Sequence, residues 1–229
     1  MSDLLKERNE RNGQASSHNE KGEAYVLFYR TIKRAFDFIC AGMALLVLSP
    51  VLLIVAVAIK SEDGGPVIHR RQCVGRGQRT YRMYKFRTMV PDADQLEKYL
   101  TPEQIIQYKK ETKLDDDPRI TRIGKFLRKS SIDELPQLIN ILKGDMSLVG
   151  PRPLTRDELI HFGEYAGLVL STPPGLTGYW QVNGRSDSTY ESGKRQELEL
   201  YYVRNCSLLM DIKILFKTVT VVVCGRGAY

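Results

Sequence analysis

Two adjacent carboxylates, Asp133 and Glu134, are the residues of this sequence best suited to catalysis. Neighbouring residues of a helix point to different sides, so the pair can act together only at a helix terminus. Pro136 indicates such a terminus, because proline is tolerated among the first helical residues, whose amides have no internal partner. We therefore expect a helix that begins near Asp133 and presents both carboxylates at its positive end, where an anionic substrate also binds well.

A structural role for the same residues is the alternative. Ser131 and Glu134 have the spacing of a capping box, in which two side chains satisfy the first backbone N–H groups of a helix. In that arrangement Glu134 would only stabilise a helix start, and Asp133 would be one more acidic residue in the first turn.

Basic residues in several other motifs offer the acidic pair phosphate-binding partners. An arginine side chain matches two phosphate oxygens with parallel hydrogen bonds, which is the geometry needed to hold a pyrophosphate. The formal net charge of +7 likewise favours anionic partners, namely nucleic acid, phospholipid headgroups or phosphorylated metabolites. The candidate cations are Lys85, Arg87, Arg119, Arg122, Arg128 and Arg152.

The cysteines and histidines exclude other kinds of site. Cys40, Cys73, Cys206 and Cys224 form no CxxC pair, so neither a zinc site nor a disulfide framework is indicated. We expect them to be reduced, in a cytoplasmic setting. The three histidines are equally scattered, and any metal is therefore expected to bind to oxygen ligands.

A stretch of about 20 uncharged residues, 39–59, has the length of a membrane-spanning helix. Basic residues flank it on both sides, and positive flanks are typical of cytoplasmic segments, so both ends are expected in the cytoplasm. Ser49 and Pro50 stand midway, where the proline removes one helical hydrogen bond and favours a bend. We therefore predict a re-entrant helix that breaks at Ser49-Pro50 and leaves on the face it entered. A membrane-crossing helix with an incidental kink is the alternative.

The remaining elements follow from polarity and periodicity. Residues 1–23 are polar and predict a disordered tail. Short apolar runs at 67–68 and 81–84 predict a small amount of β structure. The helices predicted from apolar periodicity lie at 92–112, 133–142, 191–203 and 212–223. In the last one, Lys213 and Lys217 share a face, so we interpret it as an interfacial helix lying on the membrane rather than as a core helix.

Eight short motifs follow one another along the chain, and their order is far more specific than any one of them. In one-letter code they are KRAFD at 33–37, SP at 49–50, KFRTM at 85–89, DPRIT at 117–121, DELPQ at 133–137, KGDMSLVGPRP at 143–153, PGLTG at 174–178 and QVNGR at 181–185. Together they resemble the bacterial sugar transferase family of monotopic polyprenyl-phosphate phosphoglycosyl transferases. The resemblance covers residues 34–211.

The resemblance implies a two-step transfer of a sugar phosphate. Asp133 attacks the β-phosphate of a UDP-sugar and releases UMP, and polyprenyl phosphate, taken as undecaprenyl phosphate, then attacks the sugar-phosphoryl ester. Glu134, together with Asp133, helps to hold Mg²⁺. The implied phosphate or nucleotide ligands are Arg128, Arg152 and Arg185, with Lys85 and Arg87 as further candidates. Many relatives have a tryptophan where this chain has Cys206, a difference that bears on membrane anchoring there and not on the chemistry.

We therefore expect one α-rich α+β domain with a tail at 1–23, a re-entrant membrane helix at 24–60, and a cytoplasmic, membrane-associated catalytic domain at 61–229 with interfacial amphipathic helices. The expected setting is the cytoplasmic face of the bacterial inner membrane, where the chain would initiate exopolysaccharide or capsule synthesis from UDP-galactose or UDP-glucose. A UDP-N-acetylaminosugar is the alternative donor.

The expected partners are the two substrates and membrane lipids, and a homodimer stays open. The rival class is a basic membrane scaffold or a nucleic-acid-binding protein. We disfavour this class because the sequence has no recognised nucleic-acid-binding motif. Neither function would use the acidic pair.

Overall fold

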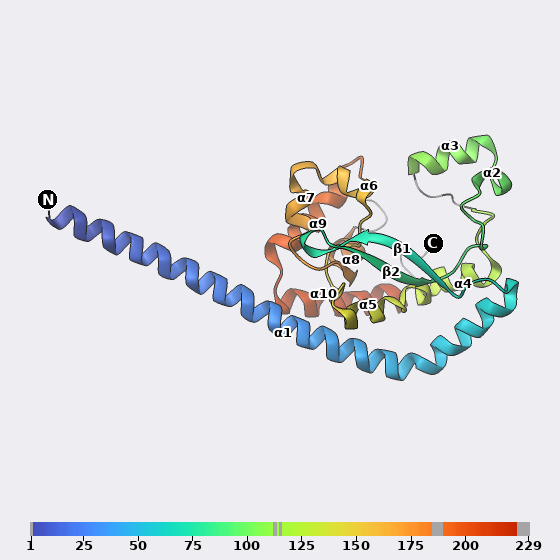
Figure 1. Ribbon diagram of the computed structural model, residues 1–229, viewed down its shortest axis with the longest axis horizontal. Helices are drawn as coiled ribbons and strands as arrows, with labels where there is room; N and C mark the ends of the chain where they lie inside the picture. Colours follow the sequence, from blue (N-terminus) through green and yellow to red (C-terminus); the bar gives the residue numbers. More distant parts are fainter. Residues whose placement is uncertain (1, 112–113, 115, 185–189, 224–229) are drawn as a thin grey trace.

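The structure, a computed structural model, describes residues 2–111, 114, 116–184 and 190–223 of the 229-residue chain, and it describes side-chain surroundings for 27–108, 114, 116–184 and 190–221 (Figure 1). Helices predominate and the strands form two small sheets, which confirms the α-rich α+β class. In chain order the elements are α1 Ser2–Asp63, β1 Ile68–Val74, η1 Arg76–Gln78, β2 Thr80–Phe86, α2 Leu96–Tyr99, α3 Pro102–Glu111, α4 Arg122–Ser130, η2 Ile132–Glu134, α5 Gln137–Lys143, β3 Ser147–Val149, α6 Arg156–Leu159, η3 Ile160–Tyr165, α7 Ala166–Val169, β4 Gly175–Thr177, α8 Tyr179–Asn183, α9 Lys194–Asn205 and α10 Leu208–Val223.

The two sheets contain two strands each. β1 and β2 form an antiparallel hairpin in which Ile68 pairs with Phe86, which confirms the β structure predicted at 67–68 and 81–84. β3 and β4 pair in parallel, with Ser147 opposite Gly175. This second pairing brings together two motifs that lie far apart in the sequence.

Helix α1 includes the segment predicted to lie in the membrane. Its backbone is helical from Ser2, so the helix also covers 2–23, where the sequence predicts a disordered tail. Because side-chain surroundings are described from Leu27 onward, the predicted boundary at residue 24 stays a prediction. Among the described residues, the segment 27–63 is the one helix long and apolar enough to cross a membrane. Its exposed apolar side chains include Leu46 and Leu53.

Pro50 lies inside α1, and Ser49 compensates for the hydrogen bond that the proline removes. Pro50 has no N–H to donate to the carbonyl of Leu46, four residues earlier. The Ser49 hydroxyl donates to that carbonyl instead, at 2.8 Å. The second half of α1 curves around the body of the protein (Figure 1). The structure therefore has a helix that is continuous through the Ser49-Pro50 pair.

Polar contacts fix the first half of α1 to the body. The Lys33 ammonium bonds Asp211 of α10 at 2.8 Å, and both side chains are buried. The Arg34 guanidinium donates to two carbonyls at the end of α5. Asp37 accepts the N–H of Leu148 in β3 at 3.1 Å. The motif at 33–37 thus joins α1 to three elements that are distant in sequence.

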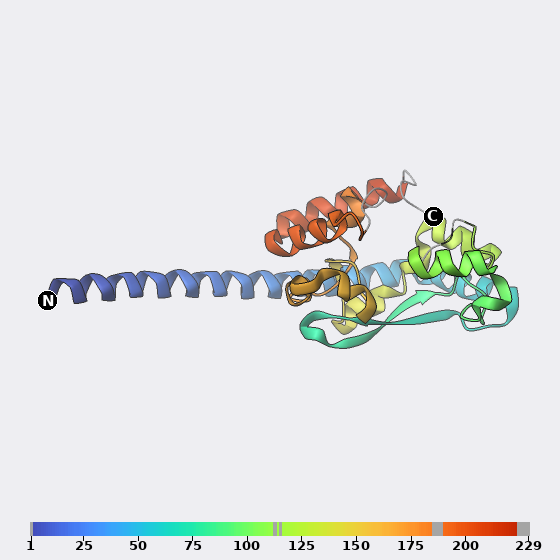
Figure 2. The same ribbon diagram turned by 90° about the horizontal axis from the view of Figure 1, so that it is seen from above.

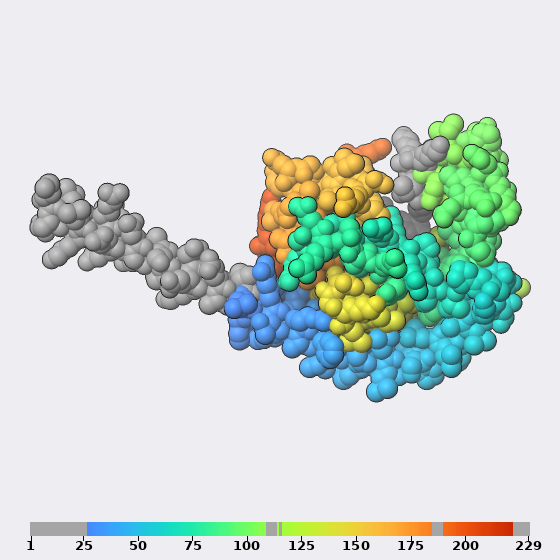
Figure 3. Space-filling view, viewed as in Figure 1, coloured from blue at the N-terminus to red at the C-terminus, as the bar shows by residue number. Residues whose placement is uncertain are grey.

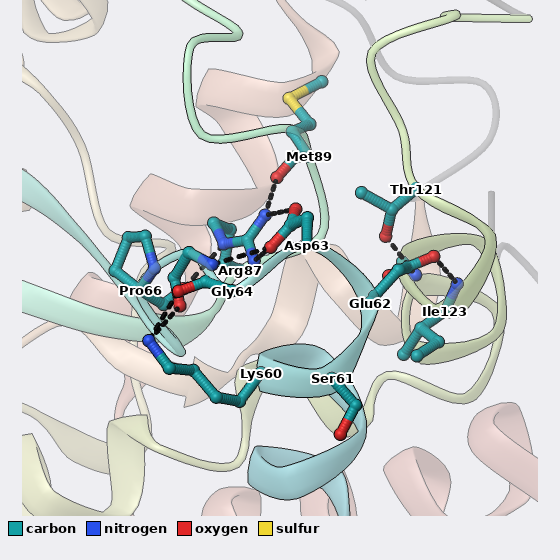
Figure 4. A network of polar contacts seen from close by, with 12 residues as sticks. Lys60, Ser61, Glu62, Asp63, Gly64, Pro66, Arg87, Met89, Thr121 and Ile123 are labelled. Carbon is teal, nitrogen blue, oxygen red and sulfur yellow. Dashed lines mark hydrogen bonds and ion pairs between the residues drawn. The ribbon is translucent and has the colours of Figure 1, made fainter.

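The second half of α1 is fixed to the same body (Figure 4). Asp63 forms a paired ion contact with Arg87, with Nη1–Oδ2 at 2.6 Å and Nη2–Oδ1 at 2.5 Å. Glu62 accepts the N–H of Ile123, in the first turn of α4, at 3.2 Å. The second half of α1 also packs into an apolar cluster with β2 and α4. Its buried members are Val55, Ile59, Phe86 and Leu127.

Some predicted helices have different bounds in the structure. The segment 92–112 contains two helices, α2 and α3, rather than one. Pro102 begins α3, and Thr101 and Gln104 satisfy each other's backbone N–H groups at 3.0 and 3.3 Å. The helix predicted at 191–203 is present as α9 but begins later than predicted, at Lys194, after Gly193 with φ +70°. The predicted C-terminal helix is confirmed as α10 and begins earlier, at Leu208.

The elements form layers around α1 and α5. Seen from above, the β1–β2 hairpin and the α9–α10 pair lie on opposite sides of α1 (Figure 2). The space-filling view has α5 between the hairpin and α1 (Figure 3). Three clusters of buried apolar side chains fill the space between these layers.

Candidate active site

Asp133 and Glu134 lie in the short 3-10 turn η2, between α4 and α5. The predicted helix start near Asp133 is wrong, because α5 begins at Gln137 with Pro136 as its N-cap. Proline does stand at a helix start, where its missing N–H leaves no helical hydrogen bond unmade. The acidic pair lies in the turn just before it, held by a hydrogen bond from the Glu134 N–H to the Ser131 carbonyl at 3.3 Å.

Ser131 ends α4 and sets the direction of this turn. Its backbone is left-handed, with φ +56° and ψ +16°, and its N–H bonds the Arg128 carbonyl at 3.2 Å. A non-glycine residue in this region costs roughly 1–3 kcal/mol, and such strain is concentrated at functional sites. Ser131 makes no side-chain capping bond to η2, so the capping box suggested by its spacing to Glu134 is not formed.

The two carboxylates have different surroundings. Glu134 forms an ion pair with Lys85 of β2, with Nζ–Oε1 at 2.9 Å. Asp133 is half-buried, and this burial raises its pKa to about 6, helped by the negative charge of Glu134 and opposed by Lys85 and Arg128. At neutral pH Asp133 is therefore ionised but poorly solvated. This is the state expected of a carboxylate that acts as a nucleophile.

Arg128 is held beside Asp133 by a contact with the segment after β2. Its Nε donates to the Thr88 hydroxyl at 2.9 Å, and the charge of Asp133 helps to offset the burial that lowers its pKa. The close approach of α4 to this segment requires Gly124. A Cβ atom there would lie 2.0 Å from the Thr88 carbonyl oxygen.

Asn140 fixes α5 against β2. It is fully buried, and its side chain donates to the Arg82 carbonyl at 2.7 Å and accepts the Tyr84 N–H at 3.0 Å. Lys85 follows Tyr84 on β2, and η2 ends shortly before α5. These hydrogen bonds therefore help to set the position of Lys85 relative to the acidic pair.

Arg152 belongs to a second group of residues, in the loop after β3. Its backbone N–H bonds Oε1 of the buried Glu199 at 3.2 Å, and its guanidinium lies 5.6 Å from the centroid of the Trp180 ring. Arg195 faces the same ring at 4.3 Å. Burial raises the pKa of Glu199 to about 7. The shared ring holds two cations near each other, an arrangement that favours an anionic ligand.

Two of the candidate cations are committed to structural contacts. The Arg87 guanidinium is buried and bonds Asp63 and the carbonyls of Pro66 and Met89, at 2.5–2.8 Å (Figure 4). We therefore assign Arg87 to joining α1 to β2 rather than to binding phosphate. Arg119 is likewise buried in an ion pair with Asp117, with Nη2–Oδ2 at 2.6 Å.

Arg185 lies outside the described residues, so its expected role in nucleotide binding stays a prediction. Of the predicted site residues, the structure brings Asp133, Glu134, Lys85 and Arg128 together. It places Arg152 with Trp180, Arg195 and Glu199.

The sequence matches the family described as bacterial sugar transferase over residues 28–225. The chain belongs to this family. The transferase is 45% identical over 203 residues to an undecaprenyl-phosphate galactose phosphotransferase of Salmonella typhimurium, covering 87% of this chain and 42% of that protein. It is 43% identical over 200 residues to the exopolysaccharide production protein ExoY of Sinorhizobium fredii, covering 86% and 88%. It is 37% identical over 209 residues to a UDP-glucose:undecaprenyl-phosphate glucose-1-phosphate transferase of Escherichia coli, covering 87% and 42%.

The chain thus spans less than half the length of two of these relatives and most of the third.

The acidic pair of this sugar transferase could hold a magnesium ion if substrate phosphates supplied further ligands. Across the described part of the chain, no three histidine, cysteine or carboxylate side chains form a group that could hold a metal by themselves. Mg²⁺, however, is commonly bound by one or two carboxylates together with substrate phosphates. Asp133 and Glu134 supply two carboxylates on one turn. Magnesium binding by the pair stays a prediction.

Sequence reasoning missed three residues that position the site of the transferase. Thr88 holds Arg128, Asn140 holds β2 against α5, and Glu199 holds the loop that carries Arg152. Thr88 lies within the motif at 85–89, so the candidate residues Lys85 and Arg87 beside it could have pointed to its role. Asn140 and Glu199 sit on helices where polar residues usually face solvent, and nothing local marks them as buried.

Proposed function

We propose that this transferase moves a sugar phosphate from a UDP-sugar to a polyprenyl phosphate, with Asp133 as the nucleophile. The observation that carries the proposal is the setting of Asp133, which is half-buried, has a pKa of about 6, and lies beside Lys85 and Arg128. Carboxylates serve as covalent carriers of phosphoryl groups in other enzymes. Family membership supports the reaction class, and two of the relatives are named for transfer to undecaprenyl phosphate.

In the first step, a carboxylate oxygen of Asp133 attacks the phosphorus that bears the sugar. The bond from this phosphorus to the bridging oxygen breaks, and UMP leaves with the electron pair. In the second step, a phosphate oxygen of the lipid attacks the same phosphorus and expels Asp133, which leaves a sugar joined to the lipid through a diphosphate. No proton is transferred in either step. Dividing the transfer in two lowers each barrier.

The basic residues supply the charge that two approaching anions require. Glu134 holds Lys85 beside Asp133, and Thr88 holds Arg128 there, so both cations are oriented before substrate binds. Asp133 and Glu134 would hold Mg²⁺ together with phosphate oxygens. When bound, this ion offsets the negative charge of the phosphates. We assign Arg152 to a phosphate of the nucleotide.

We propose UDP-galactose or UDP-glucose as donor and undecaprenyl phosphate as acceptor, in the initiation of exopolysaccharide or capsule synthesis. Relatives named for galactose and for glucose transfer support this choice. The alternative donor is a UDP-N-acetylaminosugar. Membranes containing the transferase, supplied with undecaprenyl phosphate and each UDP-sugar in turn, should release UMP with the hexose donors. Release only with N-acetylated donors would favour the alternative.

The covalent step has its own test. Enzyme given UDP-sugar without lipid acceptor should release about one UMP per active site, and the peptide that contains Asp133 should gain the mass of a sugar phosphate. Asp133→Asn should abolish both signals. If UMP were released only when both substrates were present, direct transfer would replace the two-step scheme, with the carboxylates as metal ligands.

We further propose that α1 is re-entrant and places the active site at the cytoplasmic face of the bacterial inner membrane. Its first half bonds Asp211 through Lys33, and its second half bonds Arg87 through Asp63, so both halves contact one body. A helix that crossed the bilayer would carry one end about 30 Å from that body. An apolar stripe on α10 supports an interfacial position for that helix. Its exposed members are Leu209, Ile212, Phe216 and Val219.

Cysteine labelling tests this topology. In a background without the four native cysteines, Glu23→Cys and Ser61→Cys introduce thiols on either side of the apolar segment. Both should react with a membrane-impermeant maleimide only after the cells are opened. Reaction of either thiol in intact spheroplasts, from the periplasmic side, would establish a membrane-crossing helix instead.

A further inference from the structure

An apolar groove lies between the second half of α1 and α4. Its volume is about 370 Å³, within the ~300–1,000 Å³ typical of ligand pockets. The lining side chains are Ile54, Val55 and Ala58 from α1 and Ile123, Phe126 and Leu127 from α4, with Arg122 as the one charged residue among them.

The groove opens onto the apolar surface of α1. Ile54 is 68% exposed and Phe126 is 62% exposed, and Leu53 and Val57 beside the groove are also exposed. This surface belongs to the segment 27–63, which is apolar enough to enter a membrane. An apolar groove continuous with a membrane-facing helix is suited to a hydrocarbon chain, because such a chain can pass between bilayer and groove without contact with water.

The inner wall of the groove leads to the acidic pair. Val55 and Leu127 belong to a buried cluster against which Ile132 packs, and Ile132 directly precedes Asp133. Arg128 follows Leu127 on α4 and lies within electrostatic reach of Asp133. One helix therefore presents an apolar wall and, at its C-terminal end, a cation beside the nucleophile. An apolar wall followed by a cation is suited to an amphiphile whose anionic head adjoins a long hydrocarbon tail.

We propose that this groove binds the isoprene units nearest the phosphate of the polyprenyl phosphate acceptor, with the phosphate directed to Arg128 and Asp133. The inference rests on the proposed function, since it names the binding site of the second substrate. The occupant is the polyprenyl chain rather than a phospholipid acyl chain, because Leu127 of the groove directly precedes Arg128, and the acceptor phosphate must reach this cation and Asp133.

Filling the groove should weaken acceptor binding selectively. Ala58→Phe places a ring in the groove, whereas Val57→Phe adds the same ring one position along α1, at a residue that does not line it. With undecaprenyl phosphate in detergent micelles, Ala58→Phe should raise the KM for the acceptor at least tenfold and change the KM for UDP-sugar less than twofold. Val57→Phe should leave both constants near wild type. Phe126→Ser, which removes an exposed ring, gives a second variant whose folding is not at risk and should raise the same KM.

A binding measurement separates this inference from the proposed function. An undecaprenyl phosphate analogue with a diazirine on its second isoprene unit should label residues 122–128 on illumination, also in Asp133→Asn, which needs no turnover. Ala58→Phe should abolish the label. If the wild type transferred no sugar phosphate yet was labelled, the proposed function would fail and the groove would stand.

Unchanged acceptor KM in both Ala58→Phe and Phe126→Ser would overturn the groove while leaving the function intact. Equal labelling by a diazirine phospholipid, without competition from undecaprenyl phosphate, would likewise overturn it and assign the groove to bulk lipid.

Discussion

Replacing the proposed nucleophile should make the protein more stable. The pKa of Asp133 is raised from 3.8 to about 6 because its carboxylate is partly removed from water. The folded protein therefore binds this proton more tightly than the unfolded chain does. Its free energy of unfolding must fall as pH rises from about 4 to about 6 and stay at the lower value above that range. Asp133→Asn, which carries no charge at any pH, removes this loss.

The size of the effect follows from the shift. A difference of roughly 2 pKa units at ~1.4 kcal/mol each gives about 3 kcal/mol at most at pH 7. For a chain of this size that corresponds to a rise of roughly 6–12 °C in Tm. The gain should shrink to a small fraction of this value near pH 4, where Asp133 is protonated in the folded protein and only partly ionised in the unfolded chain.

Thermal unfolding of the detergent-solubilised protein between pH 4 and pH 8 measures the effect. The quantity to compare is the Tm of Asp133→Asn minus that of the wild type at each pH, because other titrating groups, Glu199 among them, then cancel. Glu134→Gln is the matched control, since it breaks the ion pair with Lys85 and should lower the Tm. If the difference between Asp133→Asn and wild type did not change with pH, the carboxylate of Asp133 would be fully solvated and the reasoning from burial would be refuted.

Three other outcomes follow from the contacts of the site. Arg128→Ala should lower turnover at least tenfold, because a charge-assisted hydrogen bond contributes ~1.5–3 kcal/mol, whereas the exposed neighbour Lys129→Ala should not; equal rates would make Arg128 a surface charge. The value of kcat/KM should rise with pH to about 6 and then level off as Asp133 ionises, and a profile flat from pH 5 to 8 would contradict that assignment. Arg87→Lys should lower the Tm with little change in the KM for UDP-sugar; a large rise in that KM with an unchanged Tm would return Arg87 to phosphate binding.

The sequence was informative wherever a local pattern has one physical meaning. A long uncharged segment predicted a membrane helix, a proline inside it predicted a bend, and adjacent carboxylates with nearby basic motifs predicted an anionic substrate. The order of the motifs indicated the family, which the match over residues 28–225 confirms. Local patterns were weaker at boundaries. Pro136 marked a helix start correctly, but the turn at Ser131 that shifts Asp133 out of that helix was not foreseen.

Only the tertiary structure separated the cations that we propose to bind substrate from the cations that hold the fold. In the sequence, Arg87 and Arg128 are equivalent basic residues in family motifs. In the structure, Arg87 is surrounded by Asp63 and backbone carbonyls, whereas Arg128 lies near Asp133 with one bond to Thr88. The physical reason is that the interaction energy of a charged side chain depends on its neighbours and on how much water surrounds it. Both are set by residues that are distant in sequence.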